Sequence, residues 1–157
     1  MNRTMIALAS IAMLLPIGAA AQPYLVVVDP GHGGTDPGAV ACGEGEAKIA
    51  LAIGKELEKL LQADPDFKVI MTRTTDVFIP LSGRTDIAND AGADRFASIH
   101  LNSFSSSAAN GTETYCYSSG SAKSFDQRDK IQAELLAAWG LKDRGGKTAG
   151  FYVIKNT

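Results

Sequence analysis

Residues 26–40 read VVVDPGHGGTDPGAV, in which a run of β-branched residues passes directly into a loop rich in glycine and proline. A continuous apolar run of this kind is typical of a strand that is buried on both faces of a parallel sheet. The loop contains His32, the first of two histidines in the chain. A tight turn requires glycine but does not require histidine, so His32 is a candidate functional residue.

Outside this stretch, the 157-residue chain alternates between patterns typical of strands and of helices. Apolar residues recur at helical spacing in residues 46–61. Strands alternating with helices form βαβ units, so we expect a single α/β domain with a mainly parallel central sheet and helices packed on both faces. The expected strands are 24–29, 67–73, 95–102, 112–117 and 151–156; the expected helices are 46–61, 81–92 and one through 131–139; and a loop is expected at 103–108.

The first 21 residues have the layout of a secretory signal peptide, with a basic Arg3, an apolar run over 5–17 and small residues up to Ala21. We therefore expect cleavage after Ala21 and a mature domain over 22–157. The protein would then be exported, most simply to the periplasm, with an extracellular location also open. No second apolar run is long enough to cross a membrane. The net charge of -2, without a basic block, disfavours nucleic acid as a partner.

Both histidines follow predicted strands, where reactive residues of parallel sheets usually lie: His32 after the first and His100 at the end of the third. Glu46 stands where a glycine-containing loop passes into a helix. Together these three residues form the two-histidine, one-carboxylate set of a catalytic zinc site, which leaves one position for water. Glu44 lies between two glycines in the same loop and is expected to be mobile, whereas Cys42, also in this loop, remains an alternative ligand. Taken singly, each of the three also has an ordinary structural interpretation, such as a first-turn acid for Glu46.

The segments VVVDPGHGGTDPGA, GEGEAKIALAIGKELEKLL and FASIHLNS, in this order, resemble successive blocks of the zinc-dependent N-acetylmuramoyl-L-alanine amidases of bacterial cell walls. The resemblance extends over essentially the whole of residues 22–157. It implies that His32, Glu46 and His100 bind Zn²⁺ and that the substrate is peptidoglycan. The bond cleaved would be the amide between N-acetylmuramic acid and the first L-alanine of the stem peptide.

The resemblance also implies a second glutamate as the general base, on a strand that follows the block matching FYVIKNT. The sequence ends at Thr157, so we expect residues 22–157 to be C-terminally incomplete, with the last core strand missing. Glu113 is a weak candidate for the general base within the chain. The alternative function is a non-catalytic, zinc-containing peptidoglycan-binding module or an inactive fragment. Residues 116–130 are too short for the helical insertion that covers the zinc in some relatives, so no activator protein is expected.

Residues 146–148, Gly-Lys-Thr, resemble part of a phosphate-binding loop, but Leu141 stands where that loop needs glycine, and a helix precedes it. We therefore expect no nucleotide. A disulfide between Cys42 and Cys116 is permitted in an exported chain, although the sequence does not show that the two approach each other. Structural ion pairs or hydrogen bonds are expected for Arg73, Asp76, Arg84 and Asn89.

Overall fold

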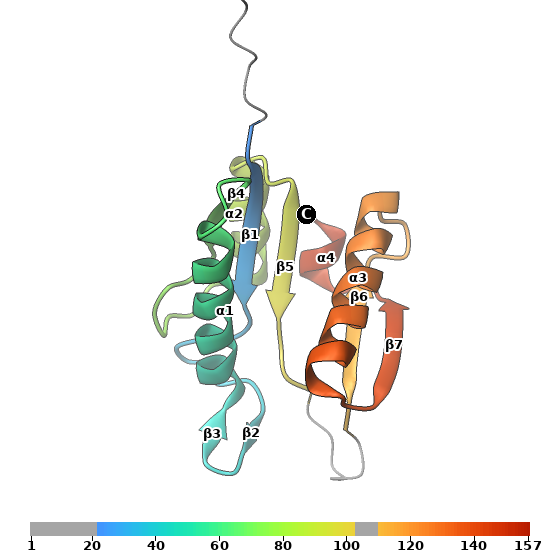
Figure 1. The fold of residues 1–157 in the computed structure, drawn as a ribbon. Coiled ribbons are helices and arrows are strands. Elements are labelled where there is room, and N and C mark those ends of the chain that lie inside the picture. Colours follow the sequence, from blue (N-terminus) through green and yellow to red (C-terminus); the bar gives the residue numbers. More distant parts are fainter. Residues whose placement is uncertain (1–21, 103–109) are drawn as a thin grey trace, which may run out of the picture.

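The computed structural model describes residues 22–102 and 110–157. The predicted signal peptide (1–21) and the predicted loop at 103–108 lie outside these described residues. Three parallel strands form the central sheet, in the order β4–β1–β5 (Figure 1). They are β1 (Tyr24–Pro30), β4 (Phe67–Met71) and β5 (Arg95–Ile99), so the first three predicted strands are confirmed.

Helices cover both faces of this sheet, as the sequence predicts: α1 (Glu46–Gln62) lies in front of it and α2 (Leu81–Asp90) behind it (Figure 1). On the α1 face, Val26 and Val28 form the buried core with Met71. Side chains alternate along a strand, so Asp29 points to the opposite face, where Arg84 of α2 contacts it. One strand thus carries an apolar core on one side and a buried polar network on the other.

The buried face of α1 differs from the one that the apolar spacing predicts. Ile53 and Leu60 belong to the apolar spacing of residues 46–61, yet they are 37% and 69% exposed. Small residues of α1 face the sheet instead. At Gly54 the helix is so close to β1 that an added Cβ atom would lie 2.7 Å from Cγ of Pro30. The helix therefore approaches β1 too closely for large side chains along this line. The residues that face the core are Ala47, Ala50 and Gly54, with Leu51, Leu57 and Leu61 packed beside them.

A second, two-stranded parallel sheet contains β6 (Thr112–Cys116) and β7 (Asp143–Thr148), with α3 (Ala122–Trp139) packed against it. The sequence predicts β6 and a helix that stops at Gly140, which has a φ of 60°. It does not predict β7, because two glycines and several charged residues hide the strand pattern. Within the described ranges, no strand ladder joins β6 to β5.

The strand predicted at 151–156 is wrong: this segment forms a short helix, α4 (Tyr152–Lys155). Short apolar runs fit a helix as well as a strand, and packing decides between them. In the helix, Val153 is buried and α4 lies against α2. The chain's last described element is therefore a helix beside α2 and not a further strand of the sheet.

The remaining elements form a small hairpin, β2 (Val40–Ala41) and β3 (Glu44–Gly45), with Cys42 exposed in its turn. Cys116 is buried at the end of β6, and both cysteines are free thiols.

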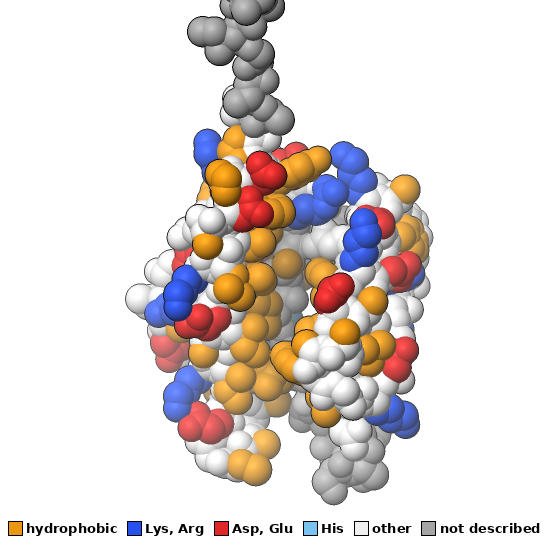
Figure 2. All heavy atoms as spheres, in the orientation of Figure 1, with side chains coloured by type: hydrophobic (Ala, Val, Ile, Leu, Met, Phe, Trp, Pro, Cys, Tyr) orange, Lys and Arg blue, Asp and Glu red, His pale blue; other side chains and the backbone are white. Residues whose placement is uncertain are grey.

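In the part of the chain that the structure describes, no helix combines the length and apolar character needed to cross a membrane. Figure 2 shows hydrophobic side chains gathered along the groove between α1 and α3.

Candidate metal centre

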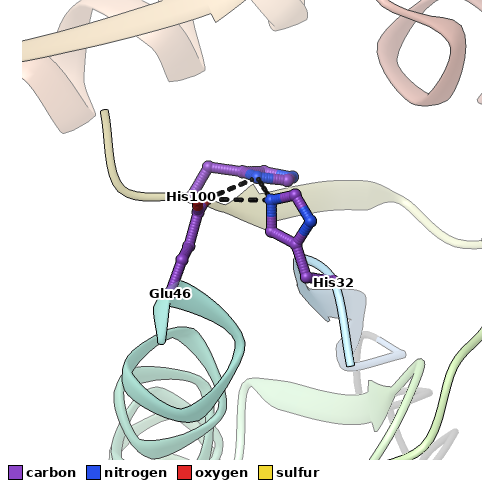
Figure 3. Close-up of side chains that lie close together, drawn as sticks. All are labelled: His32, Glu46 and His100. Carbon is purple, nitrogen blue, oxygen red and sulfur yellow. Dashed lines mark hydrogen bonds and ion pairs between the residues drawn. The ribbon is translucent and has the colours of Figure 1, made fainter. Parts of the chain in front are cut away.

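Three side chains from separate segments converge at the carboxyl end of the central sheet: His32, Glu46 and His100 (Figure 3). Nδ1 of His100 lies 3.2 Å from Nε2 of His32 and 2.9 Å from Oε1 of Glu46. The third separation, between Nε2 of His32 and Oε1 of Glu46, is 3.1 Å. The sequence therefore identified three residues that the fold brings together.

The spacing of these three atoms fits a shared metal ion. Ligand atoms at about 2.0–2.1 Å from a tetrahedral zinc are roughly 3.3 Å apart. The observed separations of 2.9–3.2 Å are close to this value. The side chain of His100 is 49% exposed, so solvent reaches the point where the three atoms meet. Two imidazole nitrogens and one carboxylate oxygen could thus hold a divalent cation and leave one position open.

His32 is oriented by Asp36, a residue that sequence reasoning missed. Nδ1 of His32 donates a hydrogen bond to Oδ2 of Asp36 at 2.8 Å. This bond places the proton on Nδ1 and leaves the lone pair of Nε2 pointing at Glu46 and His100. The hydrogen bonds from His32 and from the Gly38 N–H lower the pKa of the Asp36 carboxyl, which is therefore ionised at neutral pH. In the sequence, only the position of Asp36, four residues after His32 in a glycine-rich loop, could have indicated this contact.

The backbone around His32 is unusual as well. His32 has a φ of 60°, a left-handed conformation that residues other than glycine rarely adopt. Two backbone hydrogen bonds between Gly33 and Asp36 hold the loop in this shape. The conformation directs the imidazole toward the end of β5 and brings Asp36 back to its Nδ1 atom.

Glu46 is the first residue of α1, and its side chain is 5% exposed. Oε1 accepts a hydrogen bond from the Leu101 N–H and Oε2 accepts one from the Ala39 N–H. Burial opposes ionisation of this carboxyl, but the two backbone hydrogen bonds and the nearby histidines outweigh it and lower its pKa. A charged, fixed carboxylate is the form that a metal ligand requires.

Two glycines in the loop make room for the three converging side chains. A Cβ atom at Gly31 would overlap the His100 ring. At Gly38, which has a φ of 66°, a Cβ atom would lie 2.6 Å from the His32 ring and 2.9 Å from Cβ of Glu46. These glycines therefore serve the packing of the site and not only the turn.

Two buried arginines, Arg73 and Arg84, hold the loop around His32 by hydrogen bonds to its carbonyl oxygens. Arg84 forms an ion pair with Asp29 (2.7 Å) and donates to the carbonyl oxygens of Pro30 and His32. Arg73 donates to the carbonyl oxygens of Pro30, Gly31 and Ala47, so it ties the loop to the start of α1. Asp29 also accepts hydrogen bonds from Thr72 and Ser98, one on each side of β1.

Most of the other residues considered from sequence form hydrogen bonds or ion pairs of their own. Asp76 accepts from the Gly34 N–H, and Asn89 donates to the carbonyl oxygen of Asn156. Glu44 forms an ion pair with Lys48 (2.7 Å) instead of joining the three converging side chains. Cys42 stays at the exposed hairpin turn. Glu113 is bound to Arg144 and Lys147 on the second sheet.

A cleft of about 270 Å³ opens beside His32 and His100. Its polar wall includes Asp29, Asp36 and Arg84, and its apolar wall is formed by Phe78, Ile79, Leu81 and Val153. A larger hollow of about 380 Å³ lies along α3, lined by Lys130, Ile131, Glu134, Leu135 and Ala138. Its lining contains neither histidine nor cysteine, so the smaller cleft is the better candidate for chemistry.

Comparison with known proteins agrees with the geometry. The family model described as N-acetylmuramoyl-L-alanine amidase matches residues 26–157. The chain is 37% identical over 133 residues to a sporulation-specific N-acetylmuramoyl-L-alanine amidase of Bacillus subtilis, covering 84% of this chain and 51% of that protein. It is 42% identical to the N-acetylmuramoyl-L-alanine amidase AmiC of Neisseria meningitidis, covering 85% of this chain and 32% of the relative. The chain thus spans about half, or less, of the length of these curated relatives.

Solved structures give the same result. An N-acetylmuramoyl-L-alanine amidase from Clostridium difficile 630 superposes with a TM-score of 0.84 at 31% identity, over 87% of this chain and 75% of that chain. The amidase AmiC2 of Nostoc punctiforme superposes with a TM-score of 0.79 at 36% identity, over 85% and 73% of the two chains. With a family match over most of its length and the two histidines and glutamate converging, the chain belongs to the N-acetylmuramoyl-L-alanine amidase family.

Proposed function

We propose that this protein is a zinc-dependent peptidoglycan amidase that hydrolyses the amide between N-acetylmuramic acid and the L-alanine of the stem peptide. The observation that carries the proposal is the convergence of two histidine nitrogens and one carboxylate oxygen, 2.9–3.2 Å apart, beside an open cleft. Family membership supports the substrate class. In this proposal His32, Glu46 and His100 are the ligands of Zn²⁺.

A bound zinc ion would lower the pKa of a water molecule toward neutrality and polarise the carbonyl of the scissile amide. The residues of this chain have other tasks. Asp36 holds His32 in the tautomer whose Nε2 is free to bind. Arg73 and Arg84 keep the loop carbonyls fixed, so the His32 and Glu46 donor atoms keep their separation. The apolar wall at Phe78 and Leu81 would exclude water from one side of the bound substrate.

The proton carrier is a separate question. Glu113 already shares its Oε2 atom between Arg144 and Lys147, and a carboxylate held by two cations is a weak base. We infer that Glu113 does not take the proton and that the second glutamate implied by the family resemblance does. Removal of a general base typically slows a reaction by about 10²- to 10⁴-fold. Residues 22–157 alone are therefore expected to release little peptide.

The metal assignment is tested first, with protein purified without chelator. It should hold about one zinc per chain by elemental analysis. His32→Ala, Glu46→Ala and His100→Ala should each lose the metal, because each removes a ligand. Glu44→Ala and Cys42→Ser are matched controls and should keep it. Loss of zinc in Cys42→Ser together with its retention in Glu46→Ala would overturn the proposed ligand set.

The reaction is tested with muropeptides and the complete gene product. Cleavage should expose a free L-alanine amino terminus, leave the glycan intact, and need no added activator protein. Glu46→Ala should abolish it. Protein that binds zinc and peptidoglycan without cleaving would favour the alternative, a non-catalytic binding module. Full activity from residues 22–157 would make Glu113 the next residue to replace.

We also propose that the protein is exported, most simply to the periplasm, since peptidoglycan lies outside the cytoplasmic membrane. The amino-terminal pattern of residues 1–21 supports this proposal. Cell fractionation with amino-terminal sequencing of the mature protein tests it, and a chain that begins at Gln22 is expected. A cytoplasmic protein that retains Met1 would contradict both the export and the cleavage site.

A further inference from the structure

A second polar cluster lies on the β6–β7 sheet, outside the metal centre. Oε2 of Glu113 accepts hydrogen bonds from Nε of Arg144 (2.9 Å) and from Nζ of Lys147. The Glu113 side chain is 6% exposed, whereas those of Arg144 and Lys147 are 29% and 38% exposed. Two cations thus share one carboxylate, and the cluster keeps one positive charge that reaches solvent.

The charges in this cluster are stable at neutral pH. Burial opposes ionisation of Glu113, but hydrogen bonds from Lys147 and Arg144 outweigh it and lower the pKa of the carboxyl. The hydrogen bond to Glu113 in turn raises the pKa of Lys147, and a guanidinium is always protonated. Within residues 22–102 and 110–157, the two terminal nitrogens of Arg144 donate to no other residue. These two nitrogens can therefore donate hydrogen bonds to a further anion.

Two connections place the cluster close to the candidate metal centre. Asn102, two residues after His100, donates to Oε1 of Glu113 at 2.9 Å. Tyr115 lies on the same face of β6 as Glu113 and packs against Phe151, with ring centroids 5.2 Å apart. Phe151 precedes α4, whose Val153 lines the cleft beside His32. Figure 1 shows that β5 ends, and β6 and β7 begin, at the same edge of the molecule.

We propose that Arg144 and Lys147 bind a free carboxylate of the substrate's stem peptide, while the amide to be cleaved lies at the metal centre. This inference rests on the proposed amidase function. A planar guanidinium beside an ammonium matches a carboxylate, and a single uncompensated charge suits a monoanion better than a phosphate. Lys147 and the glycine before it lie inside β7, so they do not form the loop that would surround a phosphate. Glu113 and Asn102 position the two cations.

The test is a binding measurement that needs no turnover. A synthetic L-Ala-γ-D-Glu-L-Lys peptide is titrated by calorimetry into the complete protein, and so is the same peptide with its carboxylates converted to amides. The acid form should bind about tenfold more tightly than the amide form. Lys147→Met and Arg144→Gln should each weaken the acid form by about tenfold and leave the amide form unchanged. Lys130→Met removes an exposed lysine paired with Asp126 and is the matched control.

Lys147→Arg keeps the charge and should restore most of the binding, which separates a charge effect from damage to the sheet. Equal affinity for the acid and amide peptides, or equal losses for both in Lys147→Met, would overturn the inference. The amidase function fails independently of these results if muropeptides are not cleaved. Cleavage without any preference for free carboxylates would leave the amidase proposal standing and remove the carboxylate site alone.

Discussion

Asp36 shows how much of the candidate site depends on a residue that binds no metal itself. It accepts a hydrogen bond from His32 and another from the Gly38 N–H. Asp36→Ala should weaken zinc affinity by about 10- to 100-fold, because the imidazole loses its fixed tautomer and orientation. Asp36→Asn should have a smaller effect, since its side-chain carbonyl can still accept from Nδ1. Competition with a chromophoric chelator measures both affinities.

Asp126→Ala is the control for this prediction, because Asp126 is exposed and contacts Lys130 far from the loop. Its zinc affinity should equal that of the parent protein. An unchanged affinity in Asp36→Ala would show that packing alone orients His32, and the role given to Asp36 would be wrong.

At the residue scale, the sequence was enough to identify the three side chains that converge, but not the contacts that hold them in place. His32 and His100 are the chain's two histidines, and both follow strands of the central sheet, so residue type and position were enough to single them out. Asp36 is an ordinary charged residue in sequence, and for Arg73 and Arg84 the sequence predicts ion pairs or hydrogen bonds without their partners. Their function comes from backbone carbonyls and a ring nitrogen that only the folded loop brings to them.

At the scale of elements, the packing of α1 on β1 depends on Gly54. A Cβ atom there would lie 2.7 Å from Pro30 and 3.2 Å from Cε of Met71. Gly54→Val should therefore destabilise the protein by about 1–3 kcal/mol through overpacking. Lys55→Val, at the next and exposed position, should cost only the small difference in helix propensity. Urea unfolding of the two variants gives the comparison, and equal stabilities would mean that α1 can shift away from β1.

The elements that were predicted correctly have strong periodic patterns or clear end signals. The central strands are continuous apolar runs, and α3 stops at a left-handed glycine. The errors concern segments whose structure is set by neighbours. β7 exists because β6 offers it a partner, and α4 is helical because Val153 then fills a place beside α2. Local sequence carries neither of these facts.

At the scale of the whole molecule, the two cysteines should differ in their reactivity, because one is exposed in the folded protein and the other is buried. Cys42 is exposed in the hairpin turn, and Cys116 is 5% exposed on β6. One thiol per folded chain should therefore react at once with a thiol reagent, and the second only when the β6–β7 sheet opens. Denaturant should release two in total. Fewer than two thiols in the denatured protein would show a disulfide, and two fast thiols in the folded protein would show that Cys116 is accessible.

The fold class could be predicted from the sequence, but the order of the strands and their division into two sheets could not. Alternation of strands and helices gave an α/β domain with helices on both faces of a parallel sheet, which the structure confirms. The division into a three-stranded and a two-stranded sheet was not foreseen. Strand order depends on long-range pairing, which local sequence patterns do not reveal. The Gln127 side chain of α3 donates a hydrogen bond to the Phe96 carbonyl oxygen of β5 and so links the two parts of the fold.

The left-handed backbone at His32 has a consequence for how this protein can evolve. At most positions alanine is more stable than glycine, but a φ of 60° reverses the order by about 1–2 kcal/mol. With chelator present, His32→Gly should therefore melt at a higher temperature than His32→Ala. Selection for thermal stability alone would therefore favour glycine at position 32, and the imidazole that is proposed to bind zinc would be lost. The left-handed backbone at His32 is thus a cost in stability that its proposed role as a metal ligand would account for.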